Sequence, residues 1–204
     1  MNIAKLKEAE QKFMEKYPGG FNNPEMMEIG KKHKMEQRVE FCQTNFALDR
    51  FDNPAVIVDS MVKIVSNSSM VSLFEKPKFR DFANNCSPGE KVELALALKE
   101  LLHGDEKAGF NLMSDILKRE KLAKWTLLTI IPTYFKPTYD VFIKPTTVKG
   151  IISFLEIEDI KYSSSPSYEF YTKYRDYINE IKMLVDDSFR SSNAAFSGFL
   201  MMSI

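Results

Sequence analysis

Cysteine, histidine and tryptophan are scarce in this chain, and their scarcity excludes several kinds of site. The 204 residues include two cysteines, two histidines and one tryptophan. Cys42 and Cys86 stand in separate segments without C-x-x-C spacing, so the sequence has neither a disulfide framework nor the clustered ligands of a metal site. We therefore expect reduced thiols and no bound metal.

The sequence also lacks a net charge and a long hydrophobic run. Lys and Arg together number 28, as do Asp and Glu, so no overall field attracts nucleic acid or an acidic membrane. No apolar run approaches the roughly 18 residues that a membrane-spanning helix needs. The first segment, MNIAKLKEAEQKF, lacks the apolar stretch of a signal peptide. These features predict a soluble, cytoplasmic protein with no membrane partner.

Common catalytic motifs are absent as well. The sequence contains no G-x-G-x-x-G, P-loop, G-x-S-x-G or H-E-x-x-H pattern, and we expect no organic cofactor. His33, in KKHKMEQR, is predicted to be solvated, and His103 precedes a glycine, where a cationic side chain suits the end of a helix. The paired carboxylates at 156–159 and 186–187 lie near predicted helix ends in polar surroundings, which favours surface acids over an acid–base pair.

Apolar residues at helical spacing, by contrast, are abundant. The chain is 44% hydrophobic and 27% charged, which is typical of a globular protein with a sizeable core. The pattern predicts a mainly α, compact multi-helix domain over 1–204, with at most a short extended segment near 139–143. Residues 1–50 form a candidate helical appendage. The stripe of the last long helix consists of Phe170, Tyr171, Tyr174, Ile178, Ile181 and Val185.

Several helix boundaries are readable from local signals. Asn23-Pro24, Ser87-Pro88-Gly89-Glu90 and Asp105 each predict a helix start, because a polar cap precedes proline or an acid. EKPKFRDFANN, residues 75–85, is predicted to be a loop with a short helical turn. Pro132 lies inside an apolar segment and should kink or end any helix there.

The last residues, AAFSGFLMMSI, are apolar. Chain ends fray unless other parts of the protein hold them, and a free end of this composition would expose a sticky segment. We therefore expect this segment to pack into the core or across a homodimer interface.

Charge is segregated along the second half of the chain. Residues 117–149 carry seven basic and two acidic side chains, whereas 150–187 carry eight acidic and four basic ones. Such a distribution indicates a polarised surface that suits a partner, with ordinary solvated helix faces as the alternative. The basic residues of the first part are Lys118, Arg119, Lys121, Lys124, Lys136, Lys144 and Lys149.

Residues 144–149 have the composition of an anion site at a helix start. Pro145 holds Lys144 extended, and Thr146 or Thr147 is then a natural N-cap ahead of free backbone N–H groups. Lys149 falls in the first turn, where the helix dipole disfavours a cation unless an anion lies nearby. The segment therefore predicts a phosphate or carboxylate site, with a plain threonine cap as the alternative. Lys136 is a further candidate ligand-binding residue.

Tyrosines surround the loop that follows. Tyr162 and Tyr168 flank a Ser/Pro-rich stretch and are candidate surface contacts that could stack on bases. We include Tyr162 in the predicted ligand site. Tyr171 and Tyr174 fall on the apolar stripe and are predicted to lie in the core, each with its hydroxyl bonded to a polar partner.

The chain from Lys124 onward, about its C-terminal two-fifths, resembles a family of uncharacterised bacterial proteins. The resemblance consists of a W-x3-T-x2-P pattern from Trp125 to Pro132, then FIKPTTVK, then a Y-x3-P pattern from Tyr162 to Pro166. None of these patterns is specific to a reaction. The resemblance implies a bacterial cytoplasmic protein without a known activity.

Taken together, these features favour a non-enzymatic binding or interaction module. The predicted ligand is anionic, either nucleic acid or a phosphorylated molecule, bound at the basic region 118–149. An enzyme that acts on a small anionic substrate, held by Lys144 and Lys149, is one alternative. A helical scaffold for another protein is the other.

Overall fold

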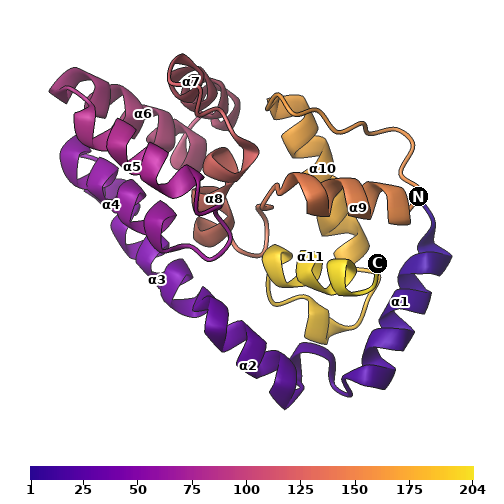
Figure 1. Cartoon of the computed structure of the whole chain (residues 1–204). Coiled ribbons are helices and arrows are strands. Elements are labelled where there is room, and N and C mark those ends of the chain that lie inside the picture. The colour runs from indigo at the N-terminus through magenta and orange to yellow at the C-terminus, as the bar shows by residue number, and fades with distance from the viewer.

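Eleven α-helices and three short 3-10 helices make up the protein, and no β-strand is present. The computed structural model describes residues Met1–Ile204. The mainly α prediction is confirmed, and the segment 139–143 joins two helices without pairing to another strand. The elements, shown in Figure 1, are α1 (Ile3–Lys16), η1 (Gly20–Asn22), α2 (Pro24–His33), α3 (Met35–Asn45), η2 (Leu48–Arg50), α4 (Pro54–Asn67), α5 (Glu75–Asn85), α6 (Pro88–His103), α7 (Glu106–Arg119), α8 (Trp125–Phe135), α9 (Pro145–Phe154), α10 (Tyr168–Lys182), η3 (Asp187–Phe189) and α11 (Asn193–Met202).

The three helix starts predicted from polar caps are confirmed. Asn23 caps α2, and its side chain accepts a hydrogen bond from a backbone N–H of the first turn. Ser87 and Glu90 form a reciprocal capping box at the start of α6. Asp105 caps α7 in the same way as Asn23 caps α2. Each cap satisfies an N–H group that the first turn of a helix leaves without a partner.

The prediction of a loop at 75–85 is wrong, because this segment forms α5. Pro77 is the third residue of the helix, a position where the missing N–H would have had no partner within the helix. Phe79 and Ala83, one turn apart, are both buried. Burial of this narrow face stabilises a helix whose polar composition alone does not favour one.

Pro132 does not end α8, which continues to Phe135. A proline inside a helix removes one backbone hydrogen bond. Here the helix is enclosed by the protein, since every residue from 125 to 134 is buried. The Thr133 hydroxyl also donates to the carbonyl of Thr129, 2.7 Å away, and so adds a bond close to the proline. Packing on all sides offsets the lost bond.

The first and last helices of the chain pack together. Figure 1 shows α2 to α7 on one side of the molecule, α1 and α9 to α11 on the other, and α8 between them. The ring of Phe13 in α1 lies 5.3 Å from the ring of Phe199 in α11. One cluster of 51 buried hydrophobic residues includes side chains from all eleven helices. Residues 1–50 thus contribute to this core, while the division into domains stays a prediction.

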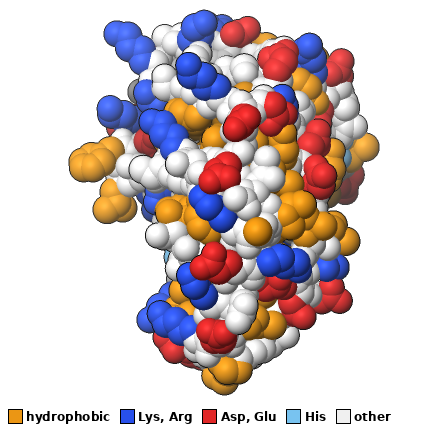
Figure 2. All heavy atoms as spheres, turned by 90° about the vertical axis from the view of Figure 1, so that its right-hand side faces the viewer, with side chains coloured by type: hydrophobic (Ala, Val, Ile, Leu, Met, Phe, Trp, Pro, Cys, Tyr) orange, Lys and Arg blue, Asp and Glu red, His pale blue; other side chains and the backbone are white.

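The surface carries charges of both signs. Figure 2 shows lysine and arginine side chains along the left edge of the face that it displays, with aspartate and glutamate mainly across its middle and right side. No helix of the structure has both the length and the apolar character required to cross a membrane.

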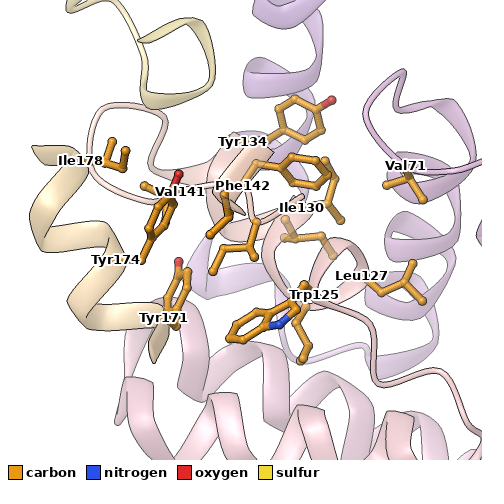
Figure 3. Close-up of a cluster of buried hydrophobic side chains, with 14 of the residues drawn as sticks. Val71, Trp125, Leu127, Ile130, Tyr134, Val141, Phe142, Tyr171, Tyr174 and Ile178 are labelled. Carbon is orange, nitrogen blue, oxygen red and sulfur yellow. The ribbon is translucent and has the colours of Figure 1, made fainter. Parts of the chain in front are cut away.

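Figure 3 shows a buried cluster in which α8 and α10 meet. Trp125 and Tyr134 of α8 lie on one side, and Tyr171 and Tyr174 of α10 lie on the other. Val141 and Phe142, from the segment that joins α8 to α9, belong to the same cluster. The core position of both α10 tyrosines is confirmed. The hydroxyl of Tyr174, however, is buried without a hydrogen-bond partner, so the partner predicted for it is wrong.

The apolar C-terminal segment packs into the core, as predicted. Phe196, Phe199 and Leu200 of α11 are fully buried. Met202 and Ile204 remain 50% and 57% exposed, so the last residues are only partly covered. The alternative of a homodimer through this segment stays a prediction.

Candidate anion-binding groove

The predicted threonine cap at α9 is wrong in its details. The helix begins at Pro145, Lys144 occupies the N-cap position, and no side chain caps the helix. Proline has a helix-compatible φ and no N–H to satisfy, so it starts the helix itself and places Thr146 and Thr147 inside the first turn. The backbone N–H groups of both threonines donate to no protein acceptor. The start of α9 therefore keeps two free donors beside exposed Lys144.

Of the other predicted ligand residues, the structure brings two together. The Lys149 ammonium lies 5.0 Å from the centre of the Tyr162 ring, a cation–π contact. Lys136 follows the last residue of α8, away from the start of that helix. None of the six residues predicted for the ligand site lines the groove described next.

A polar groove of about 640 Å³ lies between the second half of α7 and the start of α10. Its cations are Lys118, Lys121 and Lys124. None of these lysines forms an ion pair or donates a side-chain hydrogen bond to the protein, unlike the paired lysines elsewhere on the surface. Two acids, Asp115 and Glu169, also line the groove, so its unpaired cations exceed its acids.

The end of α7 places Lys121 in the groove. Lys121 has a φ of 58°, the left-handed conformation that commonly terminates helices. The next residue, Leu122, is buried and donates its N–H to the carbonyl of Leu117 over 2.7 Å. This pattern closes the helix and turns the chain toward Lys124, which precedes α8. Three lysines of the predicted basic region therefore gather at one turn.

The other wall of the groove is the start of α10. Ser167 caps the helix by accepting a hydrogen bond from the N–H of Phe170 at 3.3 Å. The backbone N–H groups of Tyr168 and Glu169 donate to no protein acceptor. Such free donors at the positive end of a helix dipole favour a negatively charged group nearby.

A buried charge cluster, which the sequence analysis missed, joins α10 to the start of α7. Arg175 of α10 donates to Asp140 over 2.8 Å and also binds Glu106 at the start of α7 through both of its terminal nitrogens. The side chains of Arg175 and Asp140 are each only 4% exposed. One signal was present: Arg175 lies between Tyr171 and Ile178 on the apolar stripe of α10, where a charged side chain must find a partner.

Two tyrosines complete the cluster. The Tyr171 hydroxyl donates to Asp140 at 2.9 Å, and the Tyr168 hydroxyl donates to Glu106 at 3.0 Å. Burial raises the pKa of Asp140 even though the hydrogen bonds from Arg175 and Tyr171 favour its ionised form. Because Tyr168 also lines the groove, its bond to Glu106 ties the groove wall of α10 to the start of α7.

Alkaline pH should unfold the protein, because the fold shields tyrosine hydroxyls from water. Burial and the neighbouring Glu106 raise the pKa of Tyr168 to about 12, and burial also raises the pKa values of Tyr134, Tyr171 and Tyr174. The unfolded chain, in which tyrosine has a pKa of about 10, releases these protons more easily. The contribution of these protonated hydroxyls to the free energy of unfolding is therefore complete below a pH of about 10 and should be lost as the pH rises toward 12 or above.

Circular dichroism and phenolate absorbance, followed together against pH, test this expectation. The helical signal should fall in step with the appearance of phenolate, and Tyr168→Phe should make the loss of stability with pH less steep. Complete ionisation of the tyrosines with an unchanged helical signal would contradict it.

The groove offers unpaired ammonium groups, backbone N–H donors and hydroxyls, which are the groups that bind phosphate and carboxylate. Its lining contains neither histidine nor cysteine. The resemblance of the chain from Lys124 onward to a bacterial family stays a prediction. No protein-family model, no curated protein and no solved structure matches this chain.

Proposed function

We propose that this protein is a non-enzymatic module that binds an anionic ligand, a nucleic acid or a phosphorylated molecule, in the groove between α7 and α10. The observation that carries the proposal is the convergence of Lys118, Lys121 and Lys124, none of them paired, on the free N–H groups at the start of α10. A bound phosphate would supply the negative charge that this arrangement lacks.

The start of α9 is a second candidate position for the same ligand class. Its free N–H groups, the hydroxyls of Thr146 and Thr147, and Lys144 are exposed or half-buried, and Lys149 stands over the Tyr162 ring. A base contacting tyrosine while its phosphate meets lysine would use both features. The groove is favoured because it is enclosed on two sides and contains more cations.

Inorganic phosphate should stabilise the protein if either position binds it. A ligand that binds only the folded state at a hundredfold excess over its Kd adds about 2.7 kcal/mol to the free energy of unfolding. We expect Lys121→Glu to abolish this rise, because it replaces a groove cation with an acid. Urea unfolding at a series of phosphate concentrations and constant ionic strength measures the effect.

Two matched variants separate the possible sites. Lys149→Glu tests the start of α9. Lys32→Glu changes an exposed, unpaired lysine of α2 and corrects for the general stabilisation that phosphate salts produce. If Lys149→Glu is the only variant that loses the phosphate-dependent rise in the free energy of unfolding, the site lies at the start of α9. Equal shifts in the wild type and in all three variants would show that neither position binds phosphate.

A further inference from the structure

Leu73 and Phe74 form an apolar tip on the surface. They are 79% and 82% exposed, more than any other large hydrophobic side chains of the protein. The tip is anchored on both sides, since Val71 before it and Phe79 after it are buried in the core. Two adjacent apolar side chains are thus held in water by an ordered support, which costs solubility unless something covers them.

Residues 75–81, which follow the tip, carry three basic and two acidic side chains, a net charge of +1. The carboxylate of Glu75, the residue after the tip, accepts a hydrogen bond from the Thr126 hydroxyl at 2.8 Å. Asp81 is paired with its neighbour Arg80 at 3.1 Å. Lys76 and Lys78, in the first turn of α5, form no ion pair, unlike the lysines in the ion pairs of α1 and α2. Glu75 keeps its negative charge, but the two unpaired lysines outnumber it, so the segment beside Leu73 and Phe74 is cationic on balance.

The same hydrogen bond places the tip near the lysines of the groove. Thr126 lies in the first turn of α8, two residues after Lys124, which lines the groove. The start of α5 and the start of α8 are therefore neighbours, and further unpaired lysines lie on this side of the molecule. An anionic surface would meet the apolar tip and these cations together.

We propose that Leu73 and Phe74 insert into an anionic lipid surface, with Lys76 and Lys78 against its headgroups. A stable protein interface needs about 800 Å² on each partner and an apolar centre, whereas the polypeptide on either side of this tip is polar or buried. Shallow insertion into a bilayer needs only a few apolar side chains beside cations. The sequence analysis expected no membrane partner because the net charge is zero and no long apolar run is present. Two exposed apolar residues alter neither property, so shallow insertion is compatible with both.

Vesicle sedimentation tests the proposal, using phosphatidylcholine vesicles with and without phosphatidylglycerol. The wild type should bind the anionic vesicles and bind the neutral ones weakly. The double variant Leu73→Ser/Phe74→Ser should lower the partition coefficient by about tenfold or more, and Lys76→Glu/Lys78→Glu should weaken binding and reduce its dependence on salt. Val92→Ser/Leu96→Ser, on an exposed face of α6, is the matched control and should bind like the wild type.

The outcomes distinguish membrane insertion of the tip from anion binding in the groove. The tip variants should keep the wild-type melting temperature and phosphate response, because neither side chain packs into the core or lines the groove. Failure of the wild type to bind anionic vesicles, or undiminished binding by the tip variant, would overturn the membrane proposal. A tip variant that instead loses self-association in gel filtration would show that a second copy of the chain covers the tip.

Discussion

Arg175→Ala should lower the free energy of unfolding by about 3–5 kcal/mol, because it leaves a buried carboxylate without its cation. Asp140 is only 4% exposed and would keep the Tyr171 hydroxyl as its one remaining donor. Glu106 would lose both of its bonds to the guanidinium. Equilibrium unfolding in urea measures the loss, with the midpoint and the slope determined separately.

A lysine on the same helix provides the control. Lys173 pairs with Asp159 at 3.1 Å, but the two side chains are 47% and 57% exposed. Exposed pairs contribute about 0–1 kcal/mol, so Lys173→Ala should have a small effect. The Arg175→Ala defect should also shrink at mildly acidic pH, since burial raises the pKa of Asp140 and protonation then removes the unpaired charge. Equal losses in the two variants would contradict a special role for the buried cluster.

Ending the chain after Ser197 should leave the protein insoluble or only loosely folded. This truncation removes Phe199 and Leu200, both fully buried. The Phe199 ring lies 4.5 Å from the ring of Phe189 and 5.3 Å from the ring of Phe13, so its loss opens a cavity between the two ends of the chain. Losing a large core side chain costs about 2–5 kcal/mol, and two such losses approach the stability of a typical domain, about 5–15 kcal/mol.

A shorter truncation tests whether burial is the cause. Ending the chain after Leu200 removes four residues, of which Met201, Met202 and Ile204 are between 37% and 57% exposed. This variant should remain soluble and keep most of its melting temperature, measured by circular dichroism. If both truncations melt like the full chain, α11 does not contribute to the core in the way that its burial indicates.

The helix starts and apolar stripes could be predicted because they depend on neighbouring residues. An N-cap acts within three positions, as Ser87 and Glu90 do, and a helical stripe repeats every three or four. The predicted stripe is buried: it runs along α10 from Phe170 to Ile181, and Val185, which follows the helix, is buried too. The error at 75–85 and the continuation of α8 past Pro132 have one origin. In both places burial against distant helices stabilises a helix that local propensity disfavours.

The candidate sites depend on contacts that span the chain. The groove combines residues 111–124 with 165–169, and the cluster that supports it joins Arg175 to Glu106 across 69 positions. No local pattern records that Lys118, Lys121 and Lys124 face the start of α10. Nor does any pattern show that Lys136, in the same basic region, lies apart from them.

By itself, then, the sequence determined the helical class of this protein, several of its helix starts and the identity of much of its core. These features follow from hydrogen bonding within a turn and from the period of the apolar residues. Only the tertiary structure decided which lysines converge, which acid and arginine are buried together, and that Leu73 and Phe74 remain in water while their neighbours are covered. Burial and charge pairing are properties of segments brought together by packing, and their energies depend on neighbours that sequence distance does not reveal.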